Sequence, residues 1–346
     1  MKNKNLYAVA LVLIAGILSL PACKEAQHPD VEAVEITLNT RRLDRDLAAI
    51  DTNAIAAELP GLKKKYPYFL DFYLDTLMGF QIHGDYSETN PYIAQGLHTF
   101  LTYPDFRGLF DSIAYHYPDT KDIDAQLKKG FQYLKYYYPH YPIPDIIYLN
   151  SNLNNYAAFT YDTLAIGIGL DMYLGEQYPF YRSVEIPDYA IRRCKEAYIP
   201  VNVFKAIYTS MHPFVMDGRT LLDMMIQKGK EQYFLSKTIP FVEEPIRLGY
   251  SKEQLEWCKA SETAIYNFFI DKQLLYATNL QQIMRYVTDG PTSAGMPPES
   301  PGNIAAWIGY RIVQEYMDKQ ENTTMQQLFA TEDAQHILQQ SKYKPK

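Results

Sequence analysis

Between residue 41 and about residue 140, apolar residues recur at intervals of three and four positions, which is typical of amphipathic helices. Successive helices are expected on these marker residues: Leu43, Leu47 and Ile50; Phe69, Phe72, Tyr73 and Leu77; Ile93, Leu97 and Leu101; Leu109, Ile113 and Tyr117; Leu127, Phe131, Leu134 and Tyr138. Proline-containing pairs predict the breaks between these helices: Pro60-Gly61, Asn90-Pro91, Tyr103-Pro104, Tyr117-Pro118 and Tyr138-Pro139.

The period of the pattern changes after Pro144. Three short apolar runs follow, at residues 146–149, 156–160 and 164–169, and turn residues separate them. They predict a small three-stranded meander, and an earlier alternation at residues 34–38 predicts a further strand. The last run contains Gly167 and Gly169 but no third glycine and no P-loop lysine, which argues against a nucleotide-binding loop.

Helical spacing returns in the last third of the chain. Pro200 is expected to open a helix that runs to His212, and Thr220 with Asp223 resembles a capping box for a helix through about Phe234. Later helices are expected from near Ser251, from Ser300-Pro301 to Met317, and across residues 334–338. These patterns predict a mainly α protein with a small β-sheet (α+β), in which residues 34–346 form a single domain with its sheet near residues 145–170.

The N-terminus has the pattern of a signal peptide, expected at residues 1–22. Lys2 and Lys4 precede an apolar run that ends near Leu20, and this run is shorter than the ~20 residues that span a bilayer. Cys23 directly follows the small residue Ala22, as in the lipobox of bacterial lipoproteins. An ordinary secretory signal with a chance cysteine is the alternative.

Lipidation of Cys23 would place the protein in the cell envelope. Cleavage before Cys23 leaves its thiol free for a diacylglyceryl group, whose acyl chains hold the protein at a bilayer, and residues 23–33 then form a tether. Lys24, rather than an acidic residue, follows the cysteine, which favours the outer membrane. The periplasmic and surface faces both remain open.

Charge and cysteine content narrow the function classes. The formal charge of −7 becomes −9 once Lys2 and Lys4 are removed, which argues against a nucleic-acid partner and against electrostatic adhesion to anionic lipid. Cys194 and Cys258 are the remaining cysteines, and either one disulfide or two separately buried thiols is compatible with their spacing. The 47% hydrophobic content predicts a large core.

The order of helix, small sheet and helix pair is that of the zincins, in which H-E-x-x-H on the first helix of the pair binds zinc. Here the pentapeptide at residues 208–212 keeps only the last histidine, His212. Tyr208 replaces the first histidine, and Thr209 replaces the catalytic glutamate. A phenol is a poor zinc ligand, and a threonine hydroxyl cannot act as a base at neutral pH. Lys228 stands where the third, acidic ligand is expected on the next helix.

These substitutions predict a vestigial zincin site with no catalytic residue, no metal and no cofactor. A metallopeptidase with atypical ligands, His212 with Asp223 or Glu231, is the alternative for this site. A single histidine beside a proline is more often a structural hydrogen-bonding group or a cation at the negative end of a helix.

Several segments along the whole chain resemble one family, the GldB gliding motility lipoproteins of Bacteroidota, which are themselves divergent relatives of HExxH peptidases. The similarity lies at residues 136–139, 167–175, 220–226, 229–230, 248–250, 253–257, 299–302, 307–313 and 341–345. The resemblance implies a membrane-anchored protein of the gliding and type IX secretion machinery, with envelope proteins as partners. No catalytic residue carries over from the family.

The favoured hypothesis is therefore a non-catalytic lipoprotein, a pseudo-peptidase, that acts by binding other envelope proteins. Its 31 tyrosines and 16 phenylalanines could form an aromatic recognition surface or fill the core. The alternatives are the atypical zinc metallopeptidase and a substrate-binding lipoprotein. The alternating strands and helices of such receptors are missing from the pattern, which disfavours the last.

Overall fold

The computed structural model describes residues 28–82, 84–86, 90 and 93–346. The expected signal peptide (residues 1–22), Cys23 and the first part of the tether therefore lie outside the described residues. Residues 31–346 form one compact unit. This unit is mainly helical with a small mixed sheet, so the predicted α+β class is confirmed. Across the described ranges, no helix is long and apolar enough to cross a bilayer.

The N-terminal helices follow the predicted spacing closely. They are α2 (Leu43–Ala48), α3 (Ile55–Lys65), α4 (Phe69–Asp71), α5 (His98–Thr102), α6 (Pro104–His116) and α7 (Lys121–Tyr137), with π-helical turns at Phe72–Leu77 and Ile93–Leu97. The predicted break at Pro60 is wrong, because α3 continues through this proline. Leu59 and Leu62 on either side of it are buried, so packing holds the helix where proline removes a hydrogen bond.

The sheet has four strands in the order β1 (Thr40–Arg42), β2 (Asp145–Leu149), β4 (Ala165–Gly169), β3 (Ala158–Tyr161). The predicted meander is wrong, because β2 pairs in parallel with β4, and β3 pairs antiparallel with β4 at the edge. β4 is buried throughout and β2 nearly so, whereas β3 is only partly buried. Burial therefore places the two most apolar strands in the centre.

The first strand lies later in the chain than its alternation predicts. Residues 34–38 form no strand, and residues 40–42 pair in parallel with β2 instead. Polar contacts hold this register: Arg41 forms an ion pair with Asp145 at 3.0 Å, and Asn39 donates to the same carboxylate at 2.7 Å.

The remaining helices form the second half of the chain. They are α8 (Phe180–Ser183), α9 (Asp188–Ile191), α10 (Ile199–Met211), α11 (Leu221–Thr238), α12 (Glu244–Leu248), α13 (Lys252–Ala260), α14 (Glu262–Asp271), α15 (Leu280–Val287), α16 (Ile304–Lys319), α17 (Met325–Ala330) and α18 (Ala334–Ser341). The predicted capping box of α11 is confirmed, since Thr220 and Asp223 bond to each other's backbone N–H.

The predicted start of α16 at Ser300-Pro301 is wrong, because the helix begins at Ile304. Ser300 and Pro301 are buried in a turn, where Ser293 donates its backbone N–H to Ser300 Oγ and its hydroxyl to the Pro301 carbonyl. These hydrogen bonds engage the serine that would otherwise have capped the helix.

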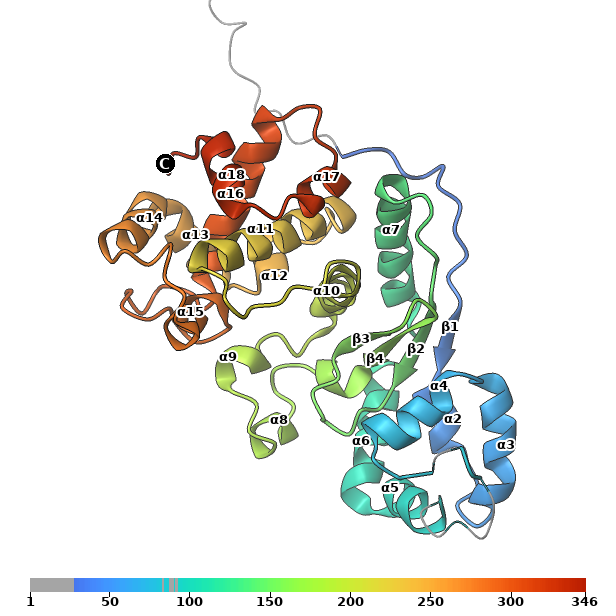
Figure 1. The fold of residues 1–346 in the computed structure, drawn as a ribbon. Helices are drawn as coiled ribbons and strands as arrows, with labels where there is room; N and C mark the ends of the chain where they lie inside the picture. Colours follow the sequence, from blue (N-terminus) through green and yellow to red (C-terminus); the bar gives the residue numbers. More distant parts are fainter. Residues whose placement is uncertain (1–27, 83, 87–89, 91–92) are drawn as a thin grey trace, which may run out of the picture. The chain divides into compact units, whose positions relative to one another are not determined.

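Two packing contacts fix the position of α11. It crosses α16 at Gly229 and Gly309, where a Cβ on Gly309 would lie far inside van der Waals contact with the Met225 carbonyl. On another side it packs on α10, which in turn packs on β3 and β4 (Figure 1). The helix pair α10–α11 is therefore held between the sheet and α16.

Candidate functional site

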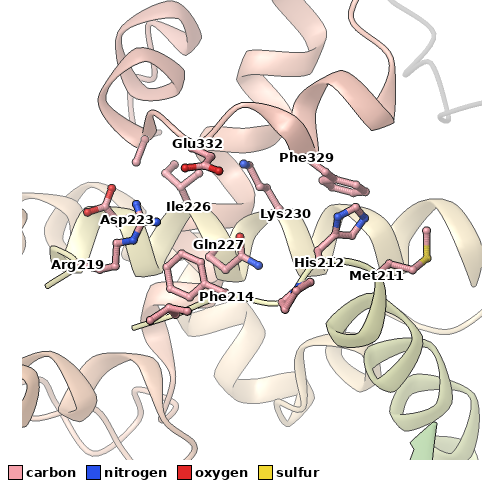
Figure 2. Close-up of a pocket in the computed structure, with 13 residues that line it drawn as sticks. Met211, His212, Phe214, Arg219, Asp223, Ile226, Gln227, Lys230, Phe329 and Glu332 are labelled. Atoms are coloured by element: carbon pink, nitrogen blue, oxygen red, sulfur yellow. The ribbon is translucent and has the colours of Figure 1, made fainter. Parts of the chain in front are cut away.

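The C-terminus of α10 and the N-terminal half of α11 border a cavity of about 340 Å³, called here the His212 pocket. His212 is the residue directly after α10, and Pro213 follows it. Figure 2 shows the pocket, which is lined by Met211, His212, Pro213, Phe214, Val215, Arg219, Asp223, Ile226, Gln227, Lys230, Phe329, Glu332 and Ala334.

Tyr208 and His212 lie one turn apart on the same face of the chain, as the sequence spacing predicts. Their ring centroids are 5.1 Å apart, and the Phe329 ring lies 4.7 Å from His212 and 5.4 Å from Tyr208. Tyr208 is buried within this aromatic cluster, and its hydroxyl has no well-formed hydrogen bond among the described residues. Burial raises the pKa of Tyr208 well above its usual 10, so this side chain stays a neutral phenol.

Lys230 is the cation that faces His212. Its side chain is 4% exposed, and Nζ donates to the Thr331 carbonyl at 2.6 Å. Burial lowers the pKa of Lys230 to about 8, while Glu332 acts in the opposite direction. At pH 7 Lys230 is therefore mostly an ammonium ion.

His212 is held as a neutral imidazole. Burial, and secondly the charge of Lys230, lower the pKa of His212 below its usual 6.5. Its Nε2 is shielded from solvent and has no hydrogen-bond partner among the described residues. The structural hydrogen bond that a lone histidine usually makes is therefore missing at this nitrogen.

Of the sequence-predicted site residues and alternative ligands, His212 and Asp223 line the cavity, whereas Tyr208, Thr209, Lys228 and Glu231 do not. Glu231 forms an ion pair with Lys205 at 3.8 Å instead. Thr209 is exposed on α10, and Lys228 is not among the residues that line the cavity. Burial raises the pKa of Asp289, but the cations Arg193 and Lys205, with a smaller effect from Lys228, outweigh burial and lower it.

The sequence reasoning missed Lys230, which faces the pocket two residues after Lys228. Asp223, Ile226, Gln227 and Lys230 all line the cavity, and their spacing of three, one and three positions marks one helical face. That spacing could have identified Lys230 from the sequence. No comparable signal exists for Glu332, which comes from the connection between α17 and α18.

The donor set of the pocket does not suit zinc. Among the residues that the structure describes, no three His, Cys, Asp or Glu side chains are grouped to hold a metal ion. The Asp223 carboxylate accepts hydrogen bonds from the backbone N–H and hydroxyl of Thr220 at 2.8 and 2.7 Å, and the ammonium of Lys230 repels a cation. The neutral phenol of Tyr208 supplies no anionic ligand.

Cys194 and Cys258 are free, separately buried thiols. Of the two alternatives that the sequence left open, a disulfide or two separately buried thiols, the structure has the second.

The chain was compared with known proteins. A family model described as gliding motility protein GldB matches residues 24–345. The chain belongs to the GldB family. The family resemblance of the sequence motifs is thereby confirmed, and membership implies a gliding motility lipoprotein. Searches of the curated proteins and of the solved structures returned no match.

Proposed function

We propose that this GldB-family chain is held in the envelope by acylated Cys23 and acts by binding other proteins of the gliding and type IX secretion machinery, without catalysis. The outer membrane is its proposed location. Its α10–α11 pair is proposed to be the remnant of a zincin site whose cavity has been retained as a binding pocket.

The observation that carries this proposal is the chemistry around His212. A zincin needs a second imidazole or an anionic oxygen at the position of Tyr208, and a general base beside it. The chain places a buried neutral phenol at the first position and an exposed threonine at the second. The Lys230 ammonium then occupies the side from which a cation would be bound.

The zincin relationship is supported by the packing of α10. This helix lies against β3, the antiparallel edge strand, and is followed directly by α11 (Figure 1). An edge strand beside the first helix of the pair is the arrangement in which a zinc peptidase could hold an extended substrate. The same geometry suits a protein that binds a peptide and releases it unchanged.

Cross-linking in envelopes tests the anchored-binding function. Wild-type chain and Cys23→Ser are expressed in the host, and lysine-reactive cross-links are identified by mass spectrometry after fractionation. The wild type is expected in the membrane fraction, cross-linked to envelope proteins of the gliding and secretion machinery, and Cys23→Ser is expected to lose both. Equal membrane retention of the two proteins would contradict the anchor, and cross-links confined to metabolic or transport proteins would contradict the assembly.

A further inference from the structure

The size and walls of the His212 pocket suit a small group that is partly apolar and partly polar. Its volume of about 340 Å³ lies near the lower end of the ~300–1,000 Å³ that is usual for ligand sites. Phe214, Ile226 and Phe329 supply apolar walls. At the rim, Val215 is 72% exposed, which leaves apolar surface for a chain that continues out of the pocket.

The polar groups of the pocket leave hydrogen-bonding capacity unused. Lys230 has three N–H donors, and the bond to the Thr331 carbonyl uses one of them. His212 Nε2 also makes no bond among the described residues, but it is shielded from solvent, so Lys230 is the donor that an incoming group meets. Figure 2 shows Lys230, Gln227 and His212 around the same opening. An anionic oxygen bound there would pair a buried ammonium that now has little compensation.

The acidic groups of the pocket restrict what kind of anion fits. Glu332 lies beside Lys230, and Asp223 is already bonded to Thr220. Arg219 stacks over the Phe214 ring, with its guanidinium carbon 5.5 Å from the centroid. Because two carboxylates line a cavity that also holds two cations, a dianion such as phosphate meets repulsion. A single carboxylate can pair with a cation of the pocket, and an N–H donor beside that carboxylate can bond to one of the acidic side chains.

We propose that the His212 pocket binds the C-terminal end of a partner polypeptide: its carboxylate on Lys230, its last backbone N–H on Glu332, and an apolar last side chain between Phe214 and Phe329. This names the chemistry of the partner and rests on the proposed binding function. Val215 provides the surface for the preceding residue of the partner.

Fluorescence polarisation with labelled hexapeptides tests the proposal on the full-length chain purified in detergent. The probes end in leucine, phenylalanine, methionine or valine, each as the free acid and as the C-terminal amide. At least one acid is expected to bind tenfold or more tightly than its amide, because the amide lacks the charge that Lys230 pairs with. This comparison uses the unchanged protein, so it does not depend on how a variant folds.

Variants then assign the binding to the pocket. Lys230→Met is expected to weaken the best acid at least tenfold, and Lys228→Met, on the same helix outside the cavity, is the matched control that should leave binding unchanged. Binding to the wild type should also fall about tenfold from pH 7 to pH 9 as Lys230 loses its proton. The groups around Lys230 are Glu332, His212, Arg219 and Asp223.

Three results would overturn the proposal. They are equal binding of acids and amides, equal effects of Lys230→Met and Lys228→Met, and dissociation constants above about 1 mM for every peptide, the limit of weak binding. Free leucine that binds as tightly as its peptide would show a small-molecule site instead. Intact cross-linking in envelopes together with any of these outcomes would refute the pocket alone and leave the proposed function standing.

Discussion

Replacing Lys230 by methionine is expected to change the pH dependence of stability. Lys230 is buried, and it bonds the Thr331 carbonyl through the only hydrogen bond that the described residues give it. Methionine has a similar length and no charge, so the substitution removes the ionisable group while it retains most of the packing. The pKa of Lys230 is about 8 in the folded chain and 10.5 in its ordinary state.

The sign of the effect follows from proton binding. Between about pH 8 and pH 10.5 the unfolded chain keeps the proton that folded Lys230 has lost, so the stability of the wild type rises with pH. This contribution is fully present above 10.5 and is lost as the pH falls through 8. Because a difference of one in pKa corresponds to about 1.36 kcal/mol, the whole gap corresponds to about 3 kcal/mol, most of which falls between pH 7 and pH 10.

Urea unfolding of both proteins at several values of pH measures this contribution. The difference in unfolding free energy, wild type minus Lys230→Met, is expected to rise by about 2 to 3 kcal/mol from pH 7 to pH 10. Taking the difference cancels the buried tyrosines, which are common to both proteins. Lys228→Met is the matched control, because it removes the same side chain from the same helix outside the pocket. A flat difference for Lys230→Met, or the same slope for both variants, would refute the reasoning.

Three further substitutions or probes test the fold around the site. Gly309→Ala is expected to destabilise by about 3 kcal/mol or more in thermal unfolding, since its Cβ meets the backbone of α11 and that backbone cannot move aside; a loss below about 1 kcal/mol would contradict the close helix crossing. Thr220→Ala is expected to cost about 1 kcal/mol through the lost cap of α11, whereas exposed Thr209→Ala should stay within about 0.5 kcal/mol, and equal losses would count against the capping box. In a Cys23→Ser background, a thiol reagent is expected to leave Cys194 and Cys258 unmodified until the protein unfolds, because burial raises the pKa of both thiols; rapid labelling of the native chain, or a disulfide on a non-reducing gel, would contradict their burial as free thiols.

Local signals in the sequence predicted several of the helices, because these begin or end at residues whose chemistry is local. Thr220 caps α11 through its own neighbour Asp223, and Pro104 lies at the first position of α6. The predicted start of α16 was wrong for a non-local reason, since Ser300 accepts a hydrogen bond from the Ser293 backbone in a buried turn. The predicted strand order was also wrong for a non-local reason. Strand pairing depends on which strands the surrounding helices bury, and the sequence of a single strand does not show this.

The site was predicted in part. The spacing of Tyr208 and His212 correctly placed both rings on one face of α10. The spacing of the zincin motif selected Lys228, although the helical face that contains Asp223 and Gln227 passes through Lys230 instead. Glu332 lies more than a hundred residues after the α10 helix, so only the packing of the α17–α18 connection on α11 brings it to the pocket.

Zinc analysis of the full-length chain, purified without chelator, tests the central claim of binding without catalysis most directly. Metal content is measured by mass spectrometry on the same sample whose peptidase activity is followed with a peptide library. The account predicts substoichiometric zinc and library peptides that bind but remain uncleaved. One zinc ion per chain, removed by a chelator together with peptide cleavage and restored with it, would contradict the account.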